Sequence, residues 1–266
     1  MNDTFTYEHI KYLKIQRRKS VFVIFSRISI LVFFIAFWEI ATRAGLIDGF
    51  LFSSPTRIVK TTENLIGEGE LFAHIGTTLS ETITGFIIAS VSGLIIAVAL
   101  WWSDSLRKIA EPYIVVLNSL PKIALGPIII IWFGAGTLSI IFMTVIITVI
   151  VTIINLLAAF CETDENKILL LRSMGANKRQ IFFKLVLPSS IPDVISTLKI
   201  NVGMSWIGSI MGEYLVSKQG IGYLIVYGGQ VFKLDLVMTS TVILCALAAL
   251  MYFSVVLIEK KLVADK

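Results

Sequence analysis

Six long apolar stretches, separated by short polar segments, dominate the pattern of this chain. They cover approximately residues 21–41, 83–102, 109–133, 138–160, 194–216 and 234–257. An α-helix needs about 20 apolar residues to cross a bilayer, and each stretch is close to or above that length. The third stretch contains Pro121 and Pro127, which predict a broken helix. The pattern predicts an all-α integral membrane protein with about six transmembrane helices.

A long polar interval, residues 161–192, lies between the fourth and fifth apolar stretches, and we call it the elbow. Gly175 separates two short helical patterns, and we expect it to adopt a left-handed backbone at the end of the first. Asn177 is expected to cap the second, with Gln180 three positions later returning the hydrogen bond. Pro188 is expected to end that second helix. The elbow is therefore predicted to be a compact, amphipathic helical loop.

Three local patterns flank the elbow. Ser190 with Asp193 predicts another capping box at the start of the fifth apolar stretch. Small residues within that stretch predict close packing along a dimer axis or a translocation path, and they are Gly203, Gly208 and Gly212. Trp101 and Trp102 end the second stretch, as tryptophans of an aromatic belt at the membrane surface do.

Composition and charge agree with a membrane protein. The 266 residues are 56% hydrophobic and only 15% charged, which excludes an ordinary soluble globule. A net charge of +5 would suggest nucleic acid as a partner of a soluble protein. In a six-span topology with the N-terminus inside, cytoplasmic segments hold fifteen Lys or Arg and outside segments five. This bias predicts that both termini and the elbow are cytoplasmic.

The same topology divides the chain. Residues 1–20 are expected to form a cytoplasmic N-terminal segment, residues 21–258 the transmembrane domain and residues 259–266 a cytoplasmic tail. The first apolar stretch is too long for a signal peptide and lacks a small-x-small cleavage site, which predicts an uncleaved span.

The elbow resembles the loop signature of binding-protein-dependent ABC importer permeases. That signature is EAA, three residues, glycine, nine residues and I-x-L-P. Gly175, followed after nine residues by Leu185-Val186-Leu187-Pro188, fits its second half in spacing. At the EAA positions this chain has Leu169, Leu170 and Leu171, so the glutamate of the signature is missing. The missing glutamate puts one polar contact to the ATPase in doubt.

Two further patches resemble the nitrate/sulfonate/taurine branch of that family. One is the third-span pattern P-x-x-A-x-x-P followed by W-F-G, at residues 121–127 and 132–134. The other is Glu213 followed by the G-I-G-Y run of residues 220–223. The resemblance extends from about residue 28 to residue 257, and it implies a fold like the transmembrane domain of type I ABC importers.

The resemblance also implies partners and contacts. The expected partners are an ABC ATPase subunit, an extracytoplasmic substrate-binding protein, a second permease copy in a homodimer and the lipid bilayer, without nucleic acid. The elbow is expected to insert a cytoplasmic coupling helix into the ATPase, in the cell inner membrane. The predicted ATPase contacts are Arg172, Met174, Gly175, Ala176, Gln180, Phe183, Leu187 and Pro188. The alternative is a surface loop with a chance amphipathic helix.

Polar residues within the spans are candidates for a translocation pathway. Lys122 either lines a path in the broken third span or extends to the membrane surface. Asn201 is a second pathway candidate, and Lys199 nearby is expected to extend to the surface. Glu213 is a third candidate, although pairing or capping near the outer end of its span is the preferred interpretation.

The sequence offers no catalytic chemistry of its own. It contains no G-x-x-x-x-G-K-[ST] motif for nucleotide phosphates, and its two histidines, His9 and His74, are far apart. We therefore predict no catalytic residue, cofactor or metal, and ATP hydrolysis in a separate subunit. A secondary transporter and an integral membrane enzyme are the alternative classes. The resemblance implies a small solute such as a sulfonate, taurine or nitrate, or alternatively a thiamine pyrimidine or riboflavin.

Overall fold

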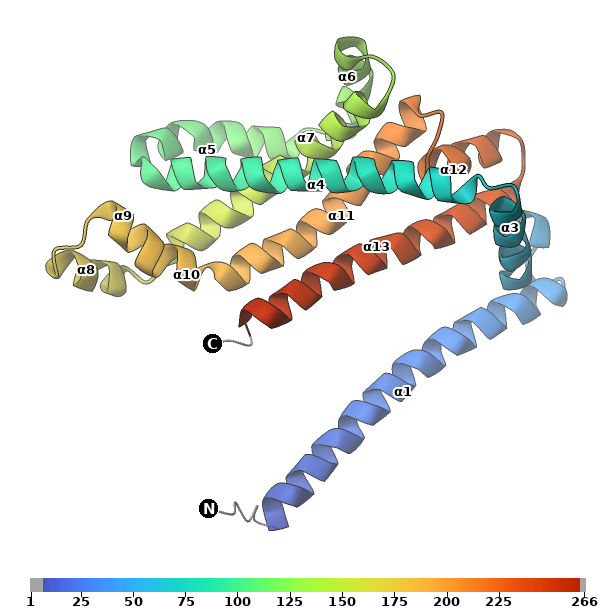
Figure 1. Ribbon diagram of the computed structural model, residues 1–266, viewed down its shortest axis with the longest axis horizontal. Helices are drawn as coiled ribbons and strands as arrows, with labels where there is room; N and C mark the ends of the chain where they lie inside the picture. The colour runs from blue at the N-terminus through green and yellow to red at the C-terminus, as the bar shows by residue number, and fades with distance from the viewer. Residues whose placement is uncertain (1–6, 264–266) are drawn as a thin grey trace.

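The computed structural model describes residues 7–263, and the regular elements in that range are all helical (Figure 1). In chain order they are α1 (Tyr7–Arg43), α2 (Gly49–Phe52), α3 (Pro55–Gly67), α4 (Leu71–Trp102), α5 (Asp104–Ser119), η1 (Lys122–Leu125), α6 (Gly126–Phe133), α7 (Thr137–Cys161), α8 (Glu165–Ser173), α9 (Lys178–Ile181), η2 (Phe182–Val186), α10 (Leu187–Ser189), α11 (Ile191–Val216), α12 (Ile221–Gln230) and α13 (Leu234–Val263). No strand occurs among these residues, so the predicted all-α class is confirmed.

Among the described residues, five helices are long and apolar enough to cross a membrane: α1, α4, α7, α11 and α13. The segment from α5 through α6 passes the same test as a pair bent by 87°. Counted as one span, this bent pair gives the predicted six. The bend lies at Pro121, between α5 and η1. Pro127 does not break the chain, because it occupies the first turn of α6, where a missing N–H costs nothing.

The second span begins earlier than its hydropathy predicts. α4 has 32 residues and starts at Leu71 rather than near residue 83. Its first turns carry His74, Thr78 and Glu81, which are 8%, 0% and 1% exposed. These polar side chains face other helices of the chain, so the helix can include them. The apolar pattern alone did not reveal this extension, because polar residues interrupt it there.

The fifth span also starts differently. The predicted capping box of Ser190 with Asp193 is wrong, since the Ser190 hydroxyl donates instead to the carbonyls of Ala159 at 3.2 Å and Val186 at 2.9 Å. The backbone N–H of Ser190 already bonds Val186, and that of Val194 bonds Ser190. Because helical bonding continues through this point, few N–H groups remain for a side chain to cap.

α7 packs between α4 and α11 through small residues. A Cβ added to Gly85 of α4 would lie 2.4 Å from the Thr144 side chain, and one added to Gly208 of α11 would lie 2.5 Å from the Thr144 Cα. Gly212 is similarly close to α7, whereas Gly203 has nothing within 4 Å. The close packing predicted for Gly208 and Gly212 is therefore present, against α7 of the same chain, while a role along a dimer axis or path stays a prediction.

Polar groups join the same three helices at their centre. Asn201 of α11 is fully buried, accepts a hydrogen bond from Thr152 of α7 at 3.1 Å and donates to Ser90 of α4 at 3.0 Å. Thr82 and Ser209 share a further bond of 2.7 Å between α4 and α11. Satisfied buried hydrogen bonds of this kind fix the relative positions of the helices.

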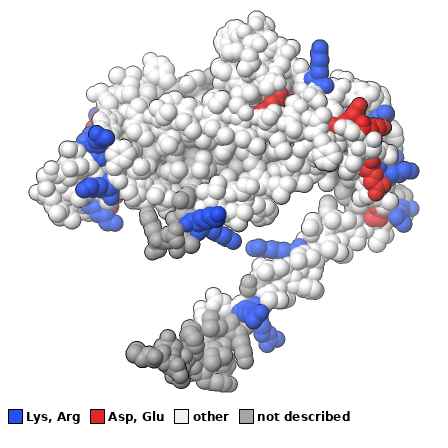
Figure 2. All heavy atoms as spheres, viewed as in Figure 1, with Lys and Arg blue, Asp and Glu red and all other residues white. Residues whose placement is uncertain are grey.

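The molecule has two distinct ends (Figure 1). The elbow, with α8, α9, η2 and α10, lies at one end, and α3 and α12 lie at the other. α1 diverges from the other spans and contacts α2 and α3 near its own C-terminal end. Figure 2 shows few charges over the middle of the bundle, with basic residues at the elbow end and both signs at the opposite end. This distribution suits a protein whose middle lies in lipid.

Candidate functional site

The first turn of the elbow is shaped by Gly175, at the end of α8. Its φ is +82°, so the predicted left-handed backbone is confirmed. The Gly175 N–H bonds the carbonyl of Arg172 and the Ala176 N–H bonds that of Leu171, each at 2.9 Å. These two bonds form a Schellman motif, which reverses the chain after α8 and directs it into α9.

α9 begins at the predicted capping box, which is confirmed. The Gln180 N–H bonds Asn177 Oδ1 and the Asn177 N–H bonds Gln180 Oε1, both at 2.9 Å. The predicted stop at Pro188 is wrong, because a π turn follows and the helical run continues to the end of α10. In this turn Leu187 donates to the carbonyl of Phe182. The wide turn places Pro188 in a new first turn, where proline is tolerated.

One face of this short helix is buried against the membrane spans. Ile181, Phe182 and Val186 are at most 3% exposed and form a cluster with the ends of α4 and α7. Trp101 belongs to this contact, with its ring centroid 4.9 Å from that of Phe182. Trp101 is half-buried in this contact, whereas Trp102 is 41% exposed, and the aromatic-belt assignment stays a prediction for both. The elbow is thus packed onto the bundle as a built part of the fold.

The opposite face of the elbow is exposed and carries both polar and large apolar side chains. Met174 is 75% and Phe183 54% exposed. Of the other predicted contacts, Arg172, Gly175 and Gln180 are exposed, and Ala176, Leu187 and Pro188 are half-buried. A hollow of about 210 Å³ is lined by Leu171, Met174, Gly175, Ala176, Gln180 and Lys184. The structure therefore brings four predicted contact residues together around one surface depression.

The positions of the missing EAA sequence adjoin this surface. Leu169 and Leu170 are 63% and 61% exposed, whereas Leu171 is half-buried against the elbow's apolar cluster. Leucine offers no carboxylate, so a contact made at these positions is apolar. Leu169 and Leu170 thus add two exposed apolar side chains to Met174 and Phe183 in the elbow.

The three pathway candidates lie apart from one another. Lys122 is half-buried at the bend of the third span, with its Nζ 3.1 Å from the carbonyl of Asn118. Asn201 and Glu213 are buried within the bundle, and twelve residues of helix separate them by about 18 Å. Lys199, which was expected to extend to the surface, forms a 2.6 Å ion pair with Glu259 of α13.

Glu213 caps the helix that follows it. The N–H groups of residues 220–222, at the start of α12, each donate a hydrogen bond to a side chain. In chain order, the acceptors are His74 Nδ1 at 2.9 Å, Thr78 Oγ1 at 2.8 Å and Glu213 Oε2 at 2.6 Å. The structure thus gives Glu213 the capping contact that the sequence favoured. His74 and Thr78 were missed, although their spacing of four residues places both on one face of a helix.

A second carboxyl group adjoins this cap. Glu81 of α4 is 1% exposed, like Glu213, and the two carboxyl groups interact. Among the described residues, one oxygen of each has no hydrogen-bond partner. Two adjacent buried carboxylates cannot both be charged without a large cost, so Glu81 destabilises the charged form of the capping residue Glu213.

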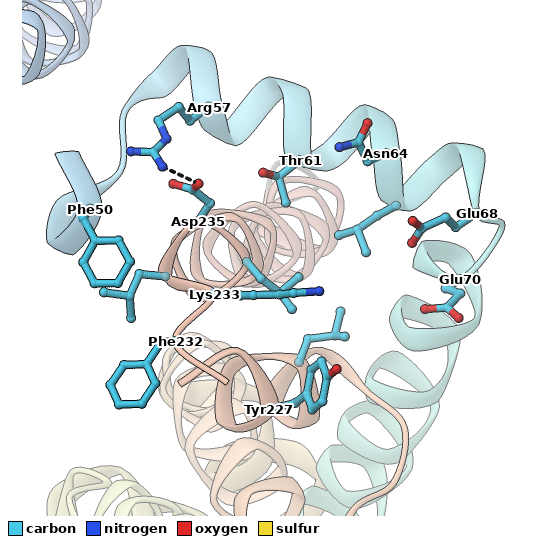
Figure 3. Close-up of a pocket in the computed structure, with 14 residues that line it drawn as sticks. Phe50, Arg57, Thr61, Asn64, Glu68, Glu70, Tyr227, Phe232, Lys233 and Asp235 are labelled. Carbon is cyan, nitrogen blue, oxygen red and sulfur yellow. Dashed lines mark ion pairs between the residues drawn. The ribbon is translucent and has the colours of Figure 1, made fainter. Parts of the chain in front are cut away.

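The end opposite the elbow carries a cavity of about 570 Å³ between α3, α12 and the start of α13 (Figure 3). Arg57 and Asp235 form an ion pair of 2.8 Å in its wall. Figure 3 shows Lys233 extending across the cavity, with Glu68 and Glu70 on the wall formed by the end of α3 and the start of α4. This cavity presents charges of both signs at the molecular surface.

The described residues contain no group of three or more His, Cys, Asp or Glu side chains placed to hold a metal ion. The other features of the surface are the exposed elbow face, the bent third span and the charged cavity.

Comparison with known proteins identifies the family of this chain. Residues 85–264 match the family model described as "Binding-protein-dependent transport system inner membrane component". The chain also has the fold of the MetNI methionine ABC transporter in inward-facing conformations, with a TM-score of 0.61 and 21% identity, over 70% of this chain and 92% of that one.

Curated relatives are transport permeases, which are not enzymes. The formylaminopyrimidine permease ThiX of Halalkalibacterium halodurans is 32% identical over 70% of this chain and 74% of its own. The aliphatic sulfonate permease SsuC of Bacillus subtilis is 26% identical, over 86% and 83% of the two chains, and the taurine permease TauC of Escherichia coli 22% identical, over 85% and 83%. The chain therefore belongs to the binding-protein-dependent transport family and is the membrane-spanning permease of an ABC importer.

Proposed function

We propose that the exposed face of the elbow is the surface on which a separate ATPase subunit docks, and that movement of this subunit drives transport. The observation that carries the proposal is the exposure of two large apolar side chains, Met174 and Phe183, together with the hollow that Met174 helps to line. The chain has no nucleotide-binding motif, so it depends on a partner for energy. The rigid caps at Gly175 and Asn177 hold this surface in one shape.

The elbow and both termini are proposed to face the cytoplasm, where ATP is available. The threefold excess of Lys and Arg in the segments on that side supports this orientation. The same orientation makes residues 1–20 and 259–266 cytoplasmic and places the charged cavity of Figure 3 outside. A binding protein is proposed to dock at that outer end, where charged groups of both signs can be matched.

A second permease copy is proposed to complete the pathway, because one bundle of this size forms only one wall. The most suitable pathway residue is Lys122, which lies at the bend of the third span. Asn201 and Glu213 support the pathway indirectly, because their hydrogen bonds hold α4, α7, α11 and α12 in place.

The solute is proposed to be a small organic or inorganic anion, such as a sulfonate, taurine or nitrate, delivered by the binding protein. The sulfonate and taurine relatives support this class. The relative at 32% identity favours a formylaminopyrimidine, a precursor of thiamine, as the second candidate. Binding measurements on the partner binding protein with taurine and formylaminopyrimidine would distinguish these classes.

The docking proposal is tested with Phe183→Ala in permease reconstituted with its ATPase. We expect this substitution to weaken ATPase binding by about tenfold or more, as removal of a central interface aromatic does. Phe232→Ala at the opposite end, where that side chain is 73% exposed, is the matched control and should leave ATPase binding unchanged. Equal binding by all three proteins would contradict docking at the elbow.

A further inference from the structure

The elbow is joined to three spans in two different ways. The chain itself connects it to α7, which precedes it, and to α11, which follows it. α4 ends at Trp102, 76 residues before Lys178 of the elbow, so non-covalent contacts alone attach the elbow to this helix. The response of α4 to movement of the elbow therefore depends on the strength of those contacts.

Phe182 provides the apolar part of this attachment. It is 2% exposed, and its ring centroid lies 4.9 Å from that of Trp101 and 6.1 Å from that of Trp102, both in the last turn of α4. On its other side, the ring of Phe160 of α7 lies 5.6 Å away. Phe182 thus fills the space between the ends of α4 and α7, where close packing transmits displacement.

Lys178 provides the polar part, one helical turn before Phe182. Its Nζ donates a 2.8 Å hydrogen bond to the carbonyl of Trp102 and lies 5.3 Å from the ring centroid of Trp101. The carbonyl groups at the C-terminal end of a helix carry partial negative charge and attract cations. Lys178 therefore donates a hydrogen bond to the last carbonyl group of α4 and also makes a cation–π contact with the Trp101 ring.

We propose that Lys178 and Phe182 are positioning residues that transmit movement of the elbow to α4. This proposal rests on the docking function proposed above. It gives the exposed face of the short helix a role in binding and the buried face a role in transmission. Phe183, on the exposed face, contacts the ATPase, whereas Phe182, on the buried face, carries the resulting displacement into the bundle. α4 in turn packs along the whole core through α7 and α11, so its movement reaches the far end of the chain.

The test measures ATPase binding, ATP hydrolysis and solute uptake in proteoliposomes that contain the complete transporter. In Lys178→Gln and Phe182→Leu we expect normal ATPase binding and continued hydrolysis. Uptake per ATP hydrolysed should fall by about fivefold or more in each variant. Lys178→Gln loses the cation–π contact and weakens the hydrogen bond to α4, and Phe182→Leu loses the aromatic contacts with Trp101 and Trp102. Unchanged uptake per ATP in both variants would overturn the proposal. Phe182→Leu preserves most of the buried volume, and Lys178 is exposed, so neither depends on a large cavity being tolerated.

A rescue experiment separates transmission from simple folding. In a chain whose two free, exposed cysteines, Cys161 and Cys245, are replaced by serine, Lys178→Cys combined with Trp102→Cys removes the contact, and a short bifunctional thiol reagent then restores a tether between the elbow and α4. We expect uptake per ATP to be low before linking and to recover after it. If uptake stays low after confirmed linking, the elbow does not act through α4.

The adjacent residue distinguishes the two proposals. Phe183→Ala should lose ATPase binding and keep the uptake per ATP of any complex that still forms. If Phe183→Ala binds the ATPase normally while Lys178→Gln is uncoupled, docking at this surface fails and transmission through α4 stands. The reverse result leaves docking intact and removes the transmission role.

Discussion

Gly175 gives the sharpest test of how the elbow holds its shape. Its φ of +82° is a conformation that glycine adopts freely, and an added Cβ would meet nothing within 4 Å. The effect of a substitution is therefore a backbone effect without steric collision. Valine in this conformation costs roughly 1–2 kcal/mol. If the chain relaxes instead, it loses the Schellman bonds from Gly175 and Ala176, each contributing about 0.5–1.5 kcal/mol.

The chain takes the route that costs less, so the docked arrangement of the elbow is disfavoured by a factor of up to about 30, and of at least about 5. We expect Gly175→Val to insert into the membrane normally, because the spans and their packing are untouched. Uptake should fall by that factor, through weaker ATPase binding or through hydrolysis that no longer drives transport. Gly175→Asn is the matched control, since asparagine visits the left-handed region more readily and should retain most activity. The measurements are an ATPase pull-down and reconstituted uptake, and full binding with full uptake in Gly175→Val would refute the reasoning.

Three further predictions concern the bundle. Gly208→Val should prevent close packing of α11 on the α7 backbone and abolish stable expression. Gly203→Ala, at a position with open space, should express normally, and equal yields of the two purified variants would contradict the packing argument. Glu81→Gln should leave the thermal unfolding temperature unchanged or raise it, because it removes one of two adjacent buried carboxyl groups. Glu213→Leu should lower the free energy of unfolding by about 1–3 kcal/mol, because it leaves the N–H groups of the α12 cap unsatisfied. A lower unfolding temperature in Glu81→Gln would argue against repulsion between the two carboxyl groups. Lys122→Met should reduce uptake while ATPase binding persists, and unchanged uptake over a range of solute concentrations would exclude a pathway role.

Local chemistry made much of the elbow predictable from the sequence. The left-handed glycine and the box of Asn177 with Gln180 depend on residues within one or two turns, and both are present as expected. The stop at Pro188 failed because a π turn earlier in the helix changed its position relative to the hydrogen-bonding pattern. Whether a helix continues across a proline depends on the backbone hydrogen bonds of the preceding turn. The identity of the residues alone does not determine those hydrogen bonds.

Long-range contacts were not predictable in this way. Trp101 ends an apolar stretch, as an interfacial tryptophan does, yet its ring packs against Phe182, 81 residues later. His74 and Thr78 look like polar residues outside a span, but they cap α12 from across the bundle. Six spans can be counted from one sequence because apolar length is a local property. Which polar side chain meets which helix end is decided by the fold.

The central claim is that the elbow contacts an ATPase on the cytoplasmic side. A photo-activatable amino acid placed at Met174 or at Phe232 tests it directly, because these residues are 75% and 73% exposed at opposite ends of the molecule. In cells that express the complete transporter, we predict that irradiation links the ATPase subunit to the probe at Met174 and not to the probe at Phe232. Linking of the ATPase at Phe232, with none at Met174, would contradict both the proposed orientation and the proposed docking surface.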